Sequence, residues 1–131
     1  MELKEYYPDI KDEWDADWPY SKRKSVHMEI FVDADHTTNK EDRRSITGLI
    51  IFINSAPYKW FHKRQMSVEA STFVAEYAAL RIAVEEAVAV THTLCSLGIP
   101  LAKPVNIYCD NQAVTVNSTT PGSILKKKHC L

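Results

Sequence analysis

The stretch that decides the fold spans residues 47–54 and reads TGLIIFIN. Apolar side chains fall on both of its faces, as expected of a central strand that is covered on each side. Residues 28–32 before it read MEIFV and alternate with the period of two that is typical of a strand. Residues 58–62 after it read YKWFH and follow a tight connection at 55–57. These segments predict an antiparallel meander of three strands.

From residue 72 to residue 97 the apolar period changes to that of a helix. One stripe is expected to face the sheet, and its members recur at three- and four-residue steps: Phe73, Tyr77, Leu80, Val84, Ala87, Val88, Thr91 and Leu94. Ser71 or Thr72 suits an N-cap, because its hydroxyl oxygen accepts a hydrogen bond from the first turn. Gly98 and Pro100 are expected to end the helix.

A short strand at residues 105–109 and a short helix at residues 111–116 follow. The order of elements indicates an α+β fold with α/β-like character, in which the long helix crosses from the third strand to the fourth. We therefore expect the fourth strand to lie parallel to the first, beside it at the sheet centre. Residues 28–131 form this predicted domain. Residues 1–27 are acidic, contain two prolines and show no core periodicity, so they are predicted to form an arm or connection segment.

The composition is that of an ordinary globular domain: 131 residues, 45% hydrophobic and 25% charged. No apolar run approaches the ~18 residues of a membrane span, and no signal-peptide pattern appears. Three cysteines without metal-type spacing favour reduced thiols and an intracellular protein of the cytoplasm or nucleus. Residues 1–19 carry seven acidic and two basic residues, whereas residues 20–131 carry ten acidic and fourteen basic ones. The second balance permits contact with a phosphate backbone, but a solvated mixed surface explains it equally.

Three acidic residues stand where a carboxylate is costly without a partner or a cation. Asp33 ends the first strand, Asp110 ends the fourth, and Glu76 lies beside the buried stripe, while Glu85 falls on the solvent side of the helix. Adjacent parallel strands bring Asp33 and Asp110 to one edge of the sheet, where open α/β sheets place their ligands. Converging carboxylates repel one another, and magnesium or manganese relieves the conflict better than zinc does. The arrangement is that of a two-metal hydrolytic site.

Each of these acids also has a structural alternative. Asp110 can cap the short helix that follows it, and Asp33 can be an ordinary turn residue. Glu76 can pair with Arg81 on the same helix or extend from the helix edge toward solvent. Asp35 and His36 are more typical of exposed turn residues than of ligands, so they are left out of the predicted site.

The chain contains four short segments, in this order: VDADH (32–36), RRSITG (43–48), STFVAEYAAL (71–80) and CDNQ (109–112). From about residue 28 onward they closely resemble the ribonuclease H domain of copia-type retrotransposon polyproteins. The resemblance implies a ribonuclease H-like fold with a mixed central sheet, helices packed on it and magnesium at the acidic edge. It also implies an endonuclease that hydrolyses the RNA strand of RNA–DNA hybrids.

The resemblance assigns roles to individual residues. Asp33, Glu76 and Asp110 match the catalytic acids that bind Mg²⁺, with Mn²⁺ as the alternative ion. The positions expected to contact nucleic acid are Asn111 and Gln112, together with Lys63, Arg64 and Gln65, for which a solvated loop is an equal alternative. The implied partners are an RNA–DNA hybrid and the reverse transcriptase portion of the parent polyprotein.

The resemblance is incomplete at the carboxyl end. Members of the family continue past the KKKH of residues 126–129 with a last strand, a last helix and a fourth acid, which are expected to be missing here. The fourth strand is then expected to form a sheet edge with uncovered apolar surface, unless another chain completes the fold. Two alternatives follow: an inactive relic that at most binds nucleic acid or a polymerase partner, and an interaction module that uses Trp14 and Trp18.

Overall fold

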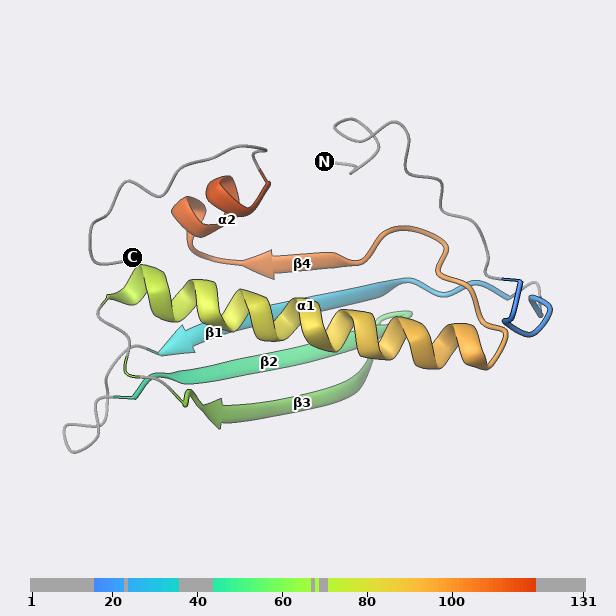
Figure 1. Cartoon of the computed structure of the whole chain (residues 1–131), viewed down its shortest axis with the longest axis horizontal. Helices are drawn as coiled ribbons and strands as arrows, with labels where there is room; N and C mark the ends of the chain where they lie inside the picture. The colour runs from blue at the N-terminus through green and yellow to red at the C-terminus, as the bar shows by residue number, and fades with distance from the viewer. Residues whose placement is uncertain (1–15, 23, 36–43, 67, 69–70, 120–131) are drawn as a thin grey trace.

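A computed structural model describes residues 16–22, 24–35, 44–66, 68 and 71–119. They form one sheet with the strand order β3-β2-β1-β4, and two helices. The elements in chain order are β1 (Met28–Asp35), β2 (Ile46–Ile53), β3 (Ala56–Arg64), α1 (Thr72–Ser96), β4 (Asn106–Cys109) and α2 (Gln112–Thr119). Both β1–β2 and β2–β3 are antiparallel, and β4 pairs parallel to β1 (Figure 1). The predicted mixed sheet of a ribonuclease H-like fold is confirmed.

Strand β2 occupies the predicted central position, between β1 and β3, but only one of its faces is closely covered. Thr47, Leu49 and Ile51 are buried on the side of α1, whereas Ile50 and Phe52 on the other side are only half-buried. The expectation of cover on both faces is therefore wrong for the described residues. Helix α1 runs along one side of the sheet in Figure 1, and the described residues place no second helix against the opposite side.

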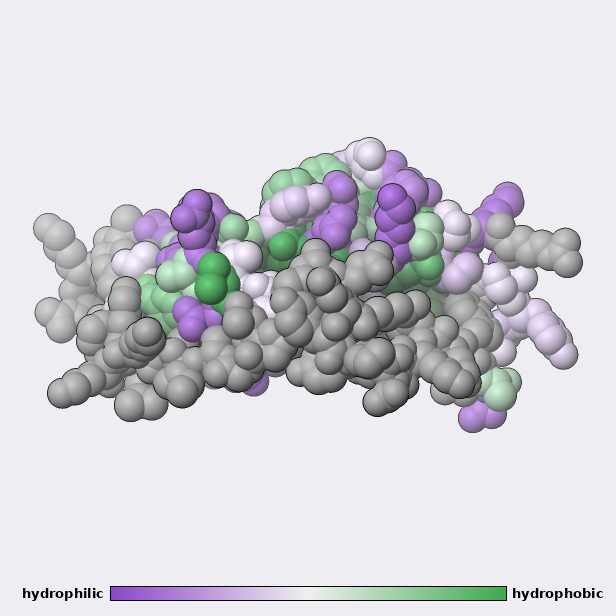
Figure 2. Space-filling model, turned by 90° about the horizontal axis from the view of Figure 1, so that it is seen from above, coloured by the Kyte–Doolittle hydropathy of each residue, from purple (hydrophilic) through white to green (hydrophobic). Residues whose placement is uncertain are grey.

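The second face of the sheet, which we call the open face, carries aromatic side chains. Register pairs Phe31 with Ile50 and Tyr108, and Ile50 with Trp60, and paired residues point to the same side of a sheet. Phe31 stacks on Tyr108 with ring centroids 4.7 Å apart, yet Phe31, Tyr108 and Trp60 remain 43%, 45% and 68% exposed. Seen from the side of α2 and β4, hydrophobic surface is also exposed between hydrophilic side chains (Figure 2). Within the described part of the chain, β4 is therefore an edge strand and apolar side chains of the open face are exposed, as expected.

The buried face of α1 is a row of alanines and not the predicted stripe of large side chains. Ala75, Ala79 and Ala83 are fully buried four residues apart, and the row continues through Ala87 and Val90. Small side chains let the helix lie close to β1, whose Met28 and Ile30 fill the core. Of the predicted stripe, Phe73 and Ala87 are buried and Leu80 and Leu94 are partly buried, whereas Tyr77, Val84 and Val88 are about half exposed, so the prediction was wrong for those three.

Both ends of α1 lie where the sequence predicts them. The Ser71 hydroxyl oxygen accepts a hydrogen bond from the Val74 N–H at 3.4 Å, which confirms Ser71 as the N-cap. Gly98 follows the helix with φ +74°, a left-handed conformation that glycine adopts readily. A Cβ at this glycine would also approach the Tyr20 carbonyl oxygen to 3.0 Å. Neither described helix combines the length and the apolar character needed to cross a bilayer.

The described part of the predicted arm packs against the carboxyl end of α1. The Lys22 N–H donates to the Gly98 carbonyl at 2.8 Å, and Val26 forms a parallel bridge with Leu101. The Trp18 ring meets His92 edge-on at 5.9 Å. Residues 16–22 and 24–27 therefore lie toward the end of α1 that is farthest from Glu76. Trp14 lies outside the described residues.

Candidate metal centre at the acidic end of the sheet

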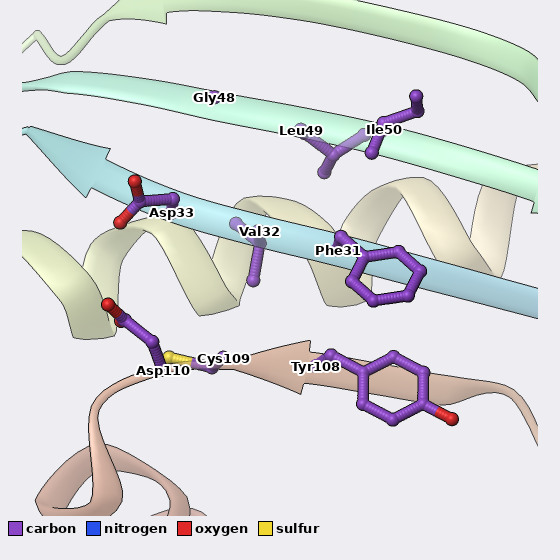
Figure 3. Close-up of a pocket in the computed structure, with 9 residues that line it drawn as sticks. All are labelled: Phe31, Val32, Asp33, Gly48, Leu49, Ile50, Tyr108, Cys109 and Asp110. Atoms are coloured by element: carbon purple, nitrogen blue, oxygen red, sulfur yellow. The ribbon is translucent and has the colours of Figure 1, made fainter.

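Two of the predicted acids meet at one end of the sheet. The parallel register pairs Val32 with Cys109, so the next residues along each strand, Asp33 and Asp110, are neighbours. Asp110 directly follows β4, as predicted. Asp33 does not end β1, because the strand continues through Asp35, but the carboxylates of Asp33 and Asp110 still lie at the same end (Figure 3).

Glu76 supplies the third carboxylate from the first turns of α1. It is only 5% exposed and follows Ala75 in the buried row of the helix. Glu85 behaves as the sequence predicts: it is exposed and accepts a hydrogen bond from Arg81 Nε at 2.9 Å. Because Arg81 points to Glu85, the described ion pair is not with Glu76. The structural alternatives for Glu76, the pair with Arg81 and extension toward solvent, are therefore contradicted.

The Glu76 carboxyl group holds its proton more tightly than an ordinary glutamate. Burial raises its pKa from 4.5 to about 7, and the negative charges of Asp110 and then Asp33 add to the increase. Hydrogen bonds from the Ala34 N–H and the Cys109 thiol oppose it without cancelling it. The negative charges of Asp110 and Asp33 thus repel that of an ionised Glu76, and a bound cation would reduce this repulsion.

Cys109 is a member of this cluster that the sequence analysis missed. Its Sγ donates to Glu76 Oε2 at 3.9 Å, and ligand atoms of Glu76, Cys109 and Asp110 all lie within 4.8 Å of one another. Burial, and then the charges of Glu76, Asp110 and Asp33, raise the pKa of the thiol. Strand alternation was the available signal, because Tyr108 on the open face requires its neighbour Cys109 to face α1.

The donors at this end of the sheet fit a hard divalent cation. Glu76 and Asp110 offer carboxylate oxygens within 4.8 Å of one another. Asp33 is exposed and is not one of the three clustered ligands, although its negative charge contributes to the raised pKa of Glu76. Oxygen-rich sets of this kind suit Mg²⁺ and Mn²⁺. A cavity of about 610 Å³ is lined by β1, β2 and the end of β4, and Asp33 and Asp110 form part of its wall whereas Glu76 does not (Figure 3). Gly48 forms part of its wall, since no side chain there fills the space beside Asp33.

The residues after Asp110 settle another structural alternative. Asn111 caps α2, because its Oδ1 accepts from the Val114 N–H at 3.2 Å. Asp110 is therefore not the residue whose side chain caps this helix, and its carboxylate belongs to the candidate metal centre. Gln112 is the first residue of α2 and is exposed.

The predicted contacts on β3 divide into two kinds. Lys63 and Arg64 are exposed, and register places them two strands from Ala34 and Asp35, about 10 Å across the sheet. Gln65 is only 5% exposed: its Nε2 donates to Thr47 Oγ1 at 3.0 Å and to the Ala75 carbonyl at 2.9 Å. Gln65 is thus a buried residue that ties the start of α1 to β2, whereas Lys63 and Arg64 are accessible.

The two remaining acidic-turn candidates do not join the cluster. Asp35 is exposed at the end of β1, as expected of a turn residue. His36 lies outside the described residues.

Comparison with known proteins identifies relatives of the chain. Over 108 residues it is 32% identical to the retrovirus-related Pol polyprotein from transposon RE1 of Arabidopsis thaliana. Over the same length it is 31% identical to the corresponding polyprotein from transposon RE2 of that plant. Each alignment covers 82% of this chain but only 7% of the relative. No protein-family model and no solved structure matches the chain significantly.

Proposed function

We propose that this homologue of transposon Pol polyproteins is a ribonuclease H domain that hydrolyses the RNA strand of RNA–DNA hybrids. The observation that carries the proposal is the buried Glu76, whose carboxyl group clusters with Asp110 and whose pKa is raised by the charges of Asp110 and Asp33. A glutamate in a core needs a compensating charge. The four motifs that resemble the copia-type ribonuclease H domain include all three of these acids.

Asp33, Glu76 and Asp110 would hold Mg²⁺, or Mn²⁺ in its place. When bound, such ions supply a water nucleophile at neutral pH and charge that stabilises the leaving oxygen. The chain contributes orientation, because Glu76 is buried on α1, where Ala75 and Ala79 are buried as well. Hydrolysis would break the bond between phosphorus and the 3′ oxygen of the RNA, leaving a 5′-phosphate and a 3′-hydroxyl.

Substrate binding is proposed to use residues on both sides of the acids. Gln112 lies exposed just beyond Asp110, and Lys63 and Arg64 lie about 10 Å away at the same end of the sheet. Basic side chains that contact phosphates bind without regard to sequence and make affinity depend on salt. The first proposed partner is therefore the phosphate backbone of the hybrid. The second is the reverse transcriptase portion of the same parent Pol polyprotein.

The test is cleavage of an end-labelled RNA–DNA hybrid in Mg²⁺ and in Mn²⁺. We expect Asp110→Asn and Glu76→Gln to abolish cleavage, because each removes a charged ligand. Glu85→Gln is the matched control on the same helix, exposed and outside the centre, and it should cleave like the unchanged chain. Cleavage that survives Asp110→Asn would refute the proposal.

A chain that binds nucleic acid or a polymerase partner without cleaving is the alternative. The open face favours it, because exposed apolar surface of this kind marks an unfilled interface. The same assay decides: a folded sample that binds the hybrid in a salt-sensitive way but never cleaves it would select the alternative.

A further inference from the structure

The Cys109 thiol gives the metal centre a ligand that magnesium does not use. Its sulfur lies 3.9 Å from Glu76 Oε2 and belongs to the three ligand atoms within 4.8 Å of one another. Sulfur is a soft donor, which selects zinc-like cations, whereas Mg²⁺ takes oxygen ligands. The cluster therefore combines two kinds of ligand in one place.

The Glu76 carboxylate is an independent reason to expect a cation beside this sulfur. It is more than nine-tenths buried, so solvent does little to balance its charge. The side-chain donor that reaches it is the Cys109 thiol, and a sulfur-to-oxygen distance of 3.9 Å is long for a hydrogen bond. The Ala34 N–H is the other donor to this carboxyl group, so of the two donors the thiol is the one that can become a metal ligand.

The distances require only a small contraction to form a zinc-type site. Zinc bonds of about 2.3 Å to sulfur and about 2.1 Å to oxygen place tetrahedral ligand atoms about 3.4–3.6 Å apart. The three ligand atoms lie within 4.8 Å of one another, so they need to approach by no more than about 1.4 Å. Asp110 is exposed at the end of β4, where its carboxylate has room to move.

We propose that Cys109, Glu76 and Asp110 form a binding site for a soft divalent cation, Zn²⁺ or Cd²⁺, held through a sulfur bond. Binding converts the thiol to a thiolate, and its proton passes to the buffer. The fourth position is left for water. Because Glu76 and Asp110 also belong to the proposed magnesium centre, the soft cation excludes Mg²⁺ from it. The competition between the soft cation and Mg²⁺ rests on the proposed function, whereas the binding of the soft cation does not.

The experiment is a Cd²⁺ titration of the full chain under reducing conditions, followed by the ultraviolet charge-transfer band of a cadmium–thiolate bond. We expect one cadmium per chain, a band that is lost in Cys109→Ser and in Cys109→Ala, and affinity at least about tenfold weaker in Glu76→Gln. Cys95→Ala and Cys130→Ser are the matched thiol controls and should keep the band. Circular dichroism shows that each variant is folded.

The outcomes separate this inference from the proposed function. A band that persists in both Cys109 variants, or no band in the unchanged chain, overturns the inference whatever the nuclease assay shows. Cadmium binding through Cys109 in a chain that never cleaves the hybrid supports the site and refutes the nuclease. In an active chain, Zn²⁺ should inhibit cleavage, excess Mg²⁺ should relieve the inhibition, and Cys109→Ser should lose zinc sensitivity in whatever activity it retains.

Discussion

Replacing Glu76 by glutamine should stabilise the chain at alkaline pH and leave its stability almost unchanged in acid. The folded pKa of Glu76 is about 7, against 4.5 for an ordinary glutamate. Between these values the folded carboxyl group keeps a proton that the unfolded chain has released. The unfolded state therefore binds fewer protons there, so stability falls as pH rises through this window and is constant on either side.

The magnitude follows from the two pKa values. Their difference is about 2.5 pH units, and each unit corresponds to 1.36 kcal/mol. Ionised Glu76 should therefore reduce the free energy of unfolding by about 3 kcal/mol at pH 8 relative to pH 4. Glutamine has nearly the same shape and stays neutral, so the variant should lack this loss.

The assay is urea unfolding of both chains between pH 4 and pH 8, in the absence of divalent cations. The stability difference between variant and unchanged chain should grow with pH, with most of the change between pH 4.5 and pH 7. Glu85→Gln is the control, because Glu85 is exposed and paired on the solvent side of α1. A Glu76→Gln difference that is the same at every pH would refute the assignment of the raised pKa to this residue.

Three further results are expected. Ala79→Leu should destabilise the fold by about 1–3 kcal/mol in urea unfolding, because Ala79 is fully buried against the sheet, while Ala89→Leu on the exposed side of α1 should not; equal effects would contradict the alanine row. Ser71→Ala should lower the free energy of unfolding by about 1 kcal/mol through loss of the N-cap, and an unchanged thermal midpoint would count against the cap. Lys63→Ala and Arg64→Ala should each weaken hybrid binding in titrations over a range of salt and reduce the salt slope by about one, whereas an unaltered slope would remove these residues from the proposed interface.

Much of the fold followed from local patterns along the chain. The period of two in β1 and the apolar run of β2 predicted neighbouring strands, and the change of period at residue 72 predicted α1. The crossing helix then fixed β4 as parallel to β1, which brought Asp33 and Asp110 to one end of the sheet. These conclusions held because strand and helix periods, and the order of elements, are properties of the sequence itself.

The tertiary structure decided which side chains are buried and which residues from distant parts of the chain contact one another. Size and hydrophobicity favoured Tyr77 and Val84 as core residues, but the helix lies close to the sheet and only its alanine row fits there. Gln65 looked like a surface residue until its amide proved to join Thr47 and Ala75 in the interior. Cys109 joins the candidate metal centre because α1 contacts β4, which brings Glu76 to its thiol. Each of these outcomes depends on the distance between elements far apart in the chain, which no local pattern contains.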